Sequence, residues 1–274
     1  MKALIFGTGS IACRHSRILS ELGYIVTGVS SRDINLNEIY HTHNFSKVLP
    51  MEHWKDEDAD IFIIATVTCL HSELVQELIS SQVKPNKIFC EKPGPKEFLG
   101  INILYNLQYL DILDDIGPAV EVRHCADARL WPSDIDWRDR YVFNNVLGGG
   151  VFLTHSHELI HCFSASRPRA VCQEDKTFIA DKDNTKLCTY FKGVIDNIQF
   201  ELDLMSVDPV RYWHHQDVVL HFYGNLPKRL NSEKVIKVTS TMVEYSYFNM
   251  WESMLTSSDT RLQSDFTWVL ENVL

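Results

Sequence analysis

The sequence lacks most features that mark disulfide-rich and nucleic-acid-binding proteins. It has seven cysteines, an odd number, and none of them forms a Cys-x-x-Cys pair. This spacing argues against a disulfide framework or a cysteine zinc site and favours buried thiols in a reducing compartment. Acidic residues outnumber basic ones by 36 to 26, the formal net charge is −10, and no basic run occurs. Nucleic acid is therefore not an expected partner.

Long apolar runs are also missing from the 274 residues. No stretch approaches the roughly 20 apolar residues needed to cross a bilayer. The first residues run directly into a predicted strand, without a basic segment and an apolar leader before it. We therefore expect a cytoplasmic protein with no membrane partner, and a chain of this length can form two modest domains.

The N-terminal part alternates predicted strands with predicted helices. Apolar runs predict strands at 3–6, 24–30, 61–65 and 87–90, and helical spacing predicts helices at 10–22 and 72–81. Strands alternating with helices at this interval are typical of an α/β fold with a parallel, doubly wound sheet. Ligands of such sheets bind beyond the carboxyl ends of the strands.

The C-terminal part has a period of two instead. Apolar and polar residues alternate over 197–205, and 187–191, 218–223 and 235–239 are further predicted strands, with helices at 245–255 and 264–273. This pattern predicts an α+β domain with an open, mainly antiparallel sheet. We place the boundary near Gly117-Pro118, which divides the chain into residues 1–117 and residues 118–274. The histidine pairs at 41/43 and 214/215 are expected in solvated loops.

A glycine-containing turn follows the first predicted strand, with the sequence Gly7-Thr8-Gly9-Ser10-Ile11-Ala12. Gly7 would allow the tight turn, Gly9 would let the backbone approach a pyrophosphate, and Ala12 would permit close packing of helix on strand. The start of the helix would add free amides and the positive end of its dipole. The segment predicts a dinucleotide site.

The end of the second predicted strand bears on which dinucleotide binds. NAD-selective sites usually place a carboxylate there, whereas a 2′-phosphate needs cationic and hydroxyl donors. Ser31 and Arg32 occupy this place, and Arg32 could fork onto a phosphate. We expect NADP to be preferred, with NAD as the alternative if Arg32 stacks on adenine and Asp33 binds the ribose.

Two residues are candidates for acid–base chemistry. Lys92 ends an apolar run in the tripeptide Glu91-Lys92-Pro93, where its ammonium could bind a substrate hydroxyl and move its proton. His157 follows a run of three glycines in a segment with helical spacing, and imidazole transfers protons near neutral pH. Thr154 shares a face with His157 in such a helix.

These segments together resemble the Gfo/Idh/MocA oxidoreductases, a family named for glucose-fructose oxidoreductase, inositol dehydrogenase and a rhizopine-catabolism protein. The matching pieces, in family order, are 7–12, 65–68 with His71, 91–93, 105–107, 137–138 and 148–158. The resemblance implies a dinucleotide-binding Rossmann domain (1–117) and a substrate and oligomerisation domain (118–274). It also implies NAD(P)-dependent hydride transfer at a hydroxyl or keto carbon of a sugar derivative, and a homo-oligomer, dimer or tetramer, formed through the C-terminal sheet. It implies a catalytic role for Lys92 and His157, and further cofactor or substrate contacts from Thr66, His71, Glu91, Asn106, Trp137, Arg138 and Thr154.

The chain also departs from the family pattern. A helix expected between Pro93 and Tyr105 is missing, Gln108 stands where arginine is common, and Ile160 stands where an aspartate is usual. The stretch from Thr154 to Glu158 resembles a variant among members thought to serve surface-carbohydrate synthesis. A catalytically silent NAD(P)-binding sensor or scaffold on the same fold is therefore the second hypothesis.

A third hypothesis comes from the sequence His157-Glu158-Leu159-Ile160-His161, which matches the helical zinc motif of metalloproteases. A hydrolase would need a third ligand, for which Glu174 could be proposed. The zinc reading explains one segment, whereas the dinucleotide reading explains several, so we expect no metal.

Overall fold

The computed structural model describes residues 1–30, 45–95, 97–98, 100–131, 136–144, 146–147, 149–150, 171–180, 185–195, 197–230 and 233–256. The chain divides into two compact units. The first unit comprises Met1–Asn106 and Tyr247–Ser264, and the second comprises Leu107–Ser246 and Asp265–Leu274. The N-terminal unit is therefore completed by a segment from near the end of the chain.

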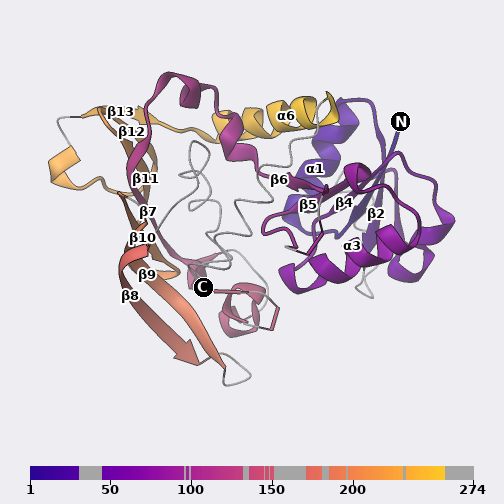
Figure 1. Cartoon of the computed structure of the whole chain (residues 1–274), viewed down its shortest axis with the longest axis horizontal. Helices are drawn as coiled ribbons and strands as arrows, with labels where there is room; N and C mark the ends of the chain where they lie inside the picture. The colour runs from indigo at the N-terminus through magenta and orange to yellow at the C-terminus, as the bar shows by residue number, and fades with distance from the viewer. Residues whose placement is uncertain are drawn as a thin grey trace. The chain divides into compact units, whose positions relative to one another are not determined.

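The first unit is built on a six-stranded parallel sheet with the order β3-β2-β1-β4-β5-β6 (Figure 1). Its strands are β1 (Lys2–Phe6), β2 (Ile25–Ser30), β3 (Lys47–Pro50), β4 (Ile61–Ile64), β5 (Ile88–Glu91) and β6 (Asn102–Leu104). This is the strand order of the dinucleotide-binding Rossmann fold, in which the order reverses between β1 and β4. The predicted α/β fold with a doubly wound parallel sheet is confirmed.

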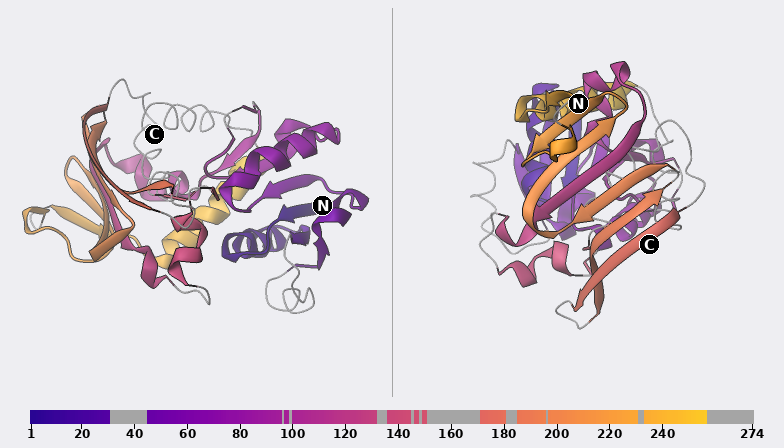
Figure 2. Two further views of the ribbon diagram at one scale, coloured as in Figure 1. Left: turned by 90° about the horizontal axis from the view of Figure 1, so that it is seen from below. Right: turned by 90° about the vertical axis from the view of Figure 1, so that its left-hand side faces the viewer.

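Helices cover both faces of this sheet. Helix α1 (Ser10–Glu21) follows β1, and α3 (His71–Ser80) follows β4. Figure 2 shows the two helices on opposite sides of the strands, as right-handed crossovers in opposite directions along the sheet require. The central strands are buried on both faces, which explains why they are unbroken apolar runs. The short 3-10 helices of this unit are η1 (Met51–Asp56), η2 (Thr68–Leu70) and η3 (Pro85–Lys87).

The second unit contains a seven-stranded mixed sheet with the order β13-β12-β11-β7-β10-β9-β8 (Figure 2). Its strands are β7 (Ala119–Asp127), β8 (Val171–Ala180), β9 (Lys186–Ile195), β10 (Ile198–Asp203), β11 (Met205–His215), β12 (Val218–Tyr223) and β13 (Lys234–Lys237). Most neighbours are antiparallel, as predicted, but β7–β10 and β12–β13 are parallel. Helix α6 (Ser240–Thr256) follows β13. The 3-10 helices are η4 (Asn106–Tyr109), η5 (Asp111–Asp115), η6 (Ala128–Leu130), η7 (Trp137–Asp139), η8 (Tyr141–Phe143) and η9 (Lys228–Leu230).

The two faces of this mixed sheet differ in chemistry. Val122, Phe200, Leu202 and Trp213 are fully buried and belong to one side of the alternating pattern on β7, β10 and β11. The other side carries polar residues that contact one another across strands, beside a smaller buried cluster formed by Cys125, Val210, Tyr212, Val219 and Leu230. The predicted period of two over 197–205 is therefore confirmed in β10.

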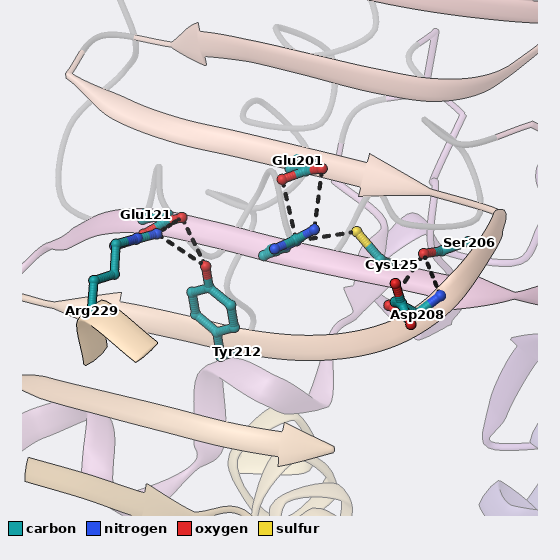
Figure 3. A network of polar contacts seen from close by, with 8 residues as sticks. Glu121, Cys125, Glu201, Ser206, Asp208, Tyr212 and Arg229 are labelled. Atoms are coloured by element: carbon teal, nitrogen blue, oxygen red, sulfur yellow. Dashed lines mark hydrogen bonds and ion pairs between the residues drawn. The ribbon is translucent and has the colours of Figure 1, made fainter. Parts of the chain in front are cut away.

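The polar side holds several separate groups of hydrogen bonds and ion pairs (Figure 3). Tyr212 donates its hydroxyl proton to Glu121 at 2.8 Å, and Arg229 pairs with the same carboxylate. Arg123 pairs with Glu201 at 3.2 Å across the β7–β10 pair. These cross-strand pairs satisfy polar groups that the sheet half-buries.

The expectation for one histidine pair is wrong. His214 and His215 lie in β11 and not in a solvated loop, and His215 is buried, with its Nδ1 2.6 Å from the carbonyl oxygen of Gly117. Burial lowers the pKa of His215. Adjacent residues of a strand face opposite sides of the sheet, and a polar residue can find a hydrogen-bond partner on either side. Two consecutive polar residues therefore do not by themselves indicate a loop.

Candidate active site

The residues predicted to bind the dinucleotide follow the carboxyl ends of neighbouring strands. The sheet register aligns Phe6 with Ile64, Ile64 with Cys90, and Cys90 with Ile103. The residues just beyond these positions therefore meet at one edge of the sheet, with the β1/β4 reversal at its centre. The structure brings together the 7–12 turn and residues 66, 91, 92 and 106 along this edge.

Gly7 makes the tight turn that the sequence predicts. Its φ is +112°, a conformation that side chains with a Cβ rarely adopt. Its amide donates to the carbonyl oxygen of Val29 at 2.8 Å. A Cβ on Gly7 would lie 2.4 Å from the carbonyl oxygen of Ala65, so β1 and β4 approach each other here only because this residue has no side chain.

Gly9 has a different role. It is the N-cap of α1 with extended backbone (φ −79°, ψ −179°), and a Cβ on it would meet no atom within 4 Å. The space beside this backbone is open, and the first amides of α1 have no partner within the helix. Ala12 is fully buried beneath the turn, where a small residue allows close packing. The turn therefore fits the diphosphate of a dinucleotide.

The Thr8 hydroxyl lies 3.5 Å from the Ser30 hydroxyl at the end of β2. This contact ties the turn to the strand end that precedes Ser31 and Arg32. These two residues lie outside the described part of the chain, so the expected preference for NADP stays a prediction.

Lys92 forms an ion pair with its neighbour Glu91. The ammonium nitrogen donates to Glu91 Oε2 at 3.1 Å, and the backbone amide of Lys92 approaches the same oxygen at 3.3 Å. The lysine side chain is 19% exposed and the glutamate side chain 8%. Lys92 is therefore held at the sheet edge with part of its surface open to solvent.

Glu91 also accepts a hydrogen bond from within the unit. The other carboxylate oxygen, Oε1, lies 2.8 Å from Nε2 of His15 on α1. Burial alone would raise the pKa of Glu91, but attraction to the Lys92 ammonium and the hydrogen bond from His15 outweigh it and lower the pKa to about 2. Glu91 is thus a carboxylate that stays charged while buried.

His15 is itself fully buried and has a second partner. The indole N–H of Trp251, on α6, donates to His15 Nδ1 at 3.1 Å. The ring of Trp251 meets the imidazole edge to face at 5.5 Å between centroids. The sequence pattern predicted neither residue for the site, although His15 shares a buried helical face with Ala12, Ser16 and Leu19. A polar residue on an apolar face was the signal that could have found it.

His71 is the first residue of α3. It is buried, and its two ring nitrogens approach the carbonyl oxygens of Pro93 at 2.9 Å and Thr66 at 3.3 Å. Burial lowers the pKa of His71, against the pull of these two oxygens. The side chain links the loop after β4 to the loop after β5, which fixes the backbone on either side of the β4/β5 pair.

The remaining predicted residues are distributed as follows. Asn106 is buried at the boundary of the first unit, just after β6. Trp137 and Arg138 belong to the second unit, where the guanidinium stacks on the indole at 4.4 Å from its centroid. Thr154 and His157 lie outside the described residues, as does His161.

A comparison with protein families identifies the N-terminal unit. Residues 1–97 match the model of the Gfo/Idh/MocA family, described as an oxidoreductase family with an NAD-binding Rossmann fold. The match confirms the resemblance noted from the sequence and supports an NAD(P)-dependent oxidoreductase as the class of enzyme. Among curated protein sequences, none matches the chain significantly.

Solved structures share the fold over nearly the whole chain. A protein from Sinorhizobium meliloti 1021, provisionally designated a myo-inositol dehydrogenase, has a TM-score of 0.67 at 15% identity and covers 98% of this chain and 94% of its own. The UDP-N-acetylglucosamine 3-dehydrogenase GnnA from Acidithiobacillus ferrooxidans has a TM-score of 0.62 at 14% identity, covering 99% and 96%. KijD10, a 3-ketoreductase from Actinomadura kijaniata solved with TDP-benzene and NADP, has a TM-score of 0.61 at 11% identity, covering 98% and 94%. At these identities the similarity establishes the fold.

The described residues offer neither a metal-binding cluster nor a membrane-spanning helix. Within the residues that the structure describes, no group of three or more His, Cys, Asp and Glu side chains could hold a metal ion. Among the described helices, none is long and apolar enough to span a membrane.

Proposed function

We propose that this protein is an NAD(P)(H)-dependent oxidoreductase that transfers a hydride between nicotinamide and a hydroxyl or keto carbon of a sugar derivative. The observation that carries the proposal is the carboxyl edge of the parallel sheet. There, an open glycine backbone at the start of α1 follows β1, the ion-paired Lys92 follows β5, and β4 lies between these two strands of one sheet.

The cofactor seat follows from the two glycines. Gly7 lets β1 and β4 come together, and Gly9 leaves open space beside amides that lack helical partners. A diphosphate there would receive backbone hydrogen bonds and the positive end of the α1 dipole. When bound, the nicotinamide supplies or accepts the hydride.

Lys92 provides the proton. In the reduction direction its ammonium donates a proton to the carbonyl oxygen of the substrate while hydride reaches the carbon, so an alcohol and a neutral amine result. In the oxidation direction the amine takes the hydroxyl proton. Pairing with Glu91 holds the ammonium at the sheet edge, which reduces the entropy lost on aligning it with substrate. His157 is proposed as the second proton-transfer residue.

Sugar nucleotides are the proposed substrates, because GnnA acts on one and KijD10 was solved with a thymidine diphosphate derivative. A role in surface-carbohydrate biosynthesis is the finer proposal. A panel of uridine- and thymidine-diphosphate sugars, assayed in both directions by nicotinamide absorbance, would identify the substrate. Lack of turnover with every sugar and either cofactor would contradict the proposal.

Lys92→Met tests the catalytic assignment. We expect turnover to fall by about 10²–10⁴-fold, because general acid–base catalysis contributes about this much, while NADP(H) binding remains. Lys87→Met is the matched control, because Lys87 is exposed near the opposite end of β5. Turnover unchanged in Lys92→Met would remove Lys92 from the mechanism.

Cofactor preference is tested by thermal shift. A ligand at 100 times its Kd stabilises the folded state by about 2.7 kcal/mol, so NADP(H) should raise the Tm more than NAD(H) at equal concentration. The expectation rests on Ser31 and Arg32, and their replacement by alanine should remove the difference. A larger shift with NAD(H) would reverse the preference.

A catalytically silent NAD(P)-binding sensor or scaffold is the second candidate. The observation that favours it is the connection from β5 to β6, which spans only residues 92–101 and contains no helix among its described residues. Parallel strands are usually joined by a longer crossover, so the backbone beside the proposed substrate site follows an unusually short path here. Tight NADP(H) binding with no turnover of any sugar nucleotide would favour this candidate.

We further propose a cytoplasmic homo-oligomer, a dimer or tetramer, formed through the second unit's sheet. Phe178, Tyr223 and Val235 expose large apolar side chains on β8, β12 and β13. Sedimentation equilibrium would measure the oligomeric state, and a monomer at micromolar concentration would contradict the proposal.

A further inference from the structure

We propose that His15 and Trp251 are positioning residues for Lys92, acting through Glu91 in a buried chain of hydrogen bonds from α6 to the sheet edge. The inference rests on the proposed catalytic role of Lys92. It extends that role by assigning a function to a histidine on the cofactor helix and to a tryptophan 236 residues later in the chain.

The central residue of this series of hydrogen bonds is Glu91, a buried charge that needs partners. An ionised carboxylate in a protein interior is stable only when hydrogen bonds and an opposite charge replace its water. Each oxygen of Glu91 has such a partner: Oε1 faces His15 Nε2 at 2.8 Å, and Oε2 faces Lys92 Nζ at 3.1 Å. With Oε1 held by His15, the carboxylate cannot rotate freely, so Oε2 stays directed at the lysine.

Trp251 determines which proton His15 carries. An indole N–H can only donate, so His15 Nδ1 must accept, and the hydrogen of the neutral ring is on Nε2. This is the tautomer that can donate to Glu91. Without the indole N–H, the ring could also place its hydrogen on Nδ1, which would turn a lone pair toward the carboxylate.

Aromatic packing keeps the imidazole in place. Trp251 and Tyr247 both meet the His15 ring edge to face, at 5.5 and 5.8 Å between centroids. Trp251 in turn packs on Phe89 of β5 at 5.2 Å. The imidazole is fully buried, so water cannot substitute for either of its hydrogen-bond partners.

The solvent exposure of the side chains rises along this series of hydrogen bonds, from His15 to Lys92 at the proposed site. His15 is fully buried, the Glu91 side chain is nearly so, and the Lys92 side chain is partly open. A buried ion pair that served stability alone could be replaced by apolar residues without loss. The polar chain here instead ends at an ammonium that solvent or a ligand can reach.

Competitive labelling with acetic anhydride tests the inference without cofactor or substrate. The rate of acetylation of Lys92, measured by peptide mass spectrometry, is divided by that of exposed Lys87 in the same molecule, which cancels differences in reagent concentration and reaction time. In His15→Leu the carboxylate loses its donor, and we expect the Lys92/Lys87 ratio to rise roughly three- to tenfold, the factor associated with one hydrogen bond. In His15→Gln an amide N–H replaces the imidazole donor, and the ratio should stay within about twofold of wild type.

Trp251→Phe keeps an aromatic ring but removes the indole N–H, and should raise the ratio by an intermediate factor. Trp54→Phe is its matched control, because Trp54 is a buried tryptophan of the same unit whose indole donates to Glu77 at 3.3 Å, away from this chain. If His15→Leu does not fold, the Trp251→Phe and Trp54→Phe pair decides.

An unchanged ratio in folded His15→Leu would overturn the inference, and so would equal increases in the leucine and glutamine variants. With a substrate in hand, the same variants should lower kcat while the KM for NADPH stays constant, and glutamine should restore most of the activity. A labelling response with no change in kcat would instead overturn the catalytic role of Lys92 and leave the hydrogen-bond chain intact.

Discussion

Replacing each glycine of the first turn by alanine should separate stability from cofactor binding. Gly7→Ala would place a Cβ 2.4 Å from a backbone carbonyl oxygen at φ +112°. An unfavourable backbone conformation costs about 1–3 kcal/mol, and overpacking typically adds about 1–3 kcal/mol. For a protein of this size each kcal/mol lowers the Tm by about 2–4 °C, so Gly7→Ala should lower it by roughly 4–24 °C without cofactor.

Gly9→Ala is the matched variant, because its Cβ would enter empty space and its extended backbone suits any residue. Its Tm without cofactor should fall by no more than about 2–4 °C, because the added Cβ is free of strain and alanine is a poorer N-cap than glycine by about 1 kcal/mol or less. The added methyl group would occupy the proposed diphosphate seat. We expect NADPH affinity to fall by at least about tenfold, equivalent to about 1.4 kcal/mol.

Differential scanning fluorimetry without cofactor and isothermal titration with NADPH give the two readouts. An unchanged Tm of Gly7→Ala relative to wild type would refute the reasoning about the turn. Unchanged NADPH affinity in Gly9→Ala would refute the placement of the diphosphate.

Three further predictions concern the stability of the two units. Glu91 has a lowered folded-state pKa of about 2, so its stabilising contribution is present above its unfolded pKa of about 4.3 and is lost as pH falls toward 2. Glu91→Gln should therefore flatten the acid limb of a curve of Tm against pH, and an unchanged slope would contradict this. Tyr212→Phe removes the proton donor to a carboxylate and should cost about 1.5–3 kcal/mol in urea unfolding, whereas exposed Tyr245→Phe should be neutral. Leu202→Ala opens a cavity in the fully buried face of the second sheet and should lower the free energy of unfolding by about 2–5 kcal/mol. Val207→Ala, at an exposed position, should change it little. Equal effects of the two substitutions would contradict the assignment of the buried face.

Much of the first unit could be predicted from local sequence. Apolar runs gave β1, β4 and β5 because strands of a parallel sheet are buried on both faces. The helix pattern and Gly23 gave the end of α1, where Leu22 is the C-cap and Gly23 has φ +85°. Strands β3 and β6 were not predicted, because they are short, contain Pro50 and Asn102, and depend on neighbouring strands for their hydrogen bonds.

The second unit shows what a period of two cannot supply. Alternation over 197–205 identified which residues of β10 face the core, but strand direction is not encoded in alternation. The parallel pairing of β10 with β7 came only from the structure. Strand β8 was missed because Gln173-Glu174-Asp175-Lys176 is a polar run, and an edge strand needs less apolar surface than a central one.

The candidate site was predicted where it follows motifs and missed where it depends on distant contacts. The 7–12 turn and Lys92 lie where parallel-strand geometry places them. The support behind Lys92 involves Trp251, and no local pattern links residue 251 to residue 15. Long-range contacts of this kind have no local signature, whereas a polar histidine on an apolar helical face does.

The return of α6 to the first unit has a consequence for how the protein is made. A ribosome adds about 5–20 residues per second, so Trp251 emerges roughly 7–30 s after Asn106. During that interval the nascent Rossmann sheet has His15 and Phe89 without the indole that covers them. The domain made first is thus finished last, and chains cut short before α6 would present an unsealed apolar patch to chaperones and proteases.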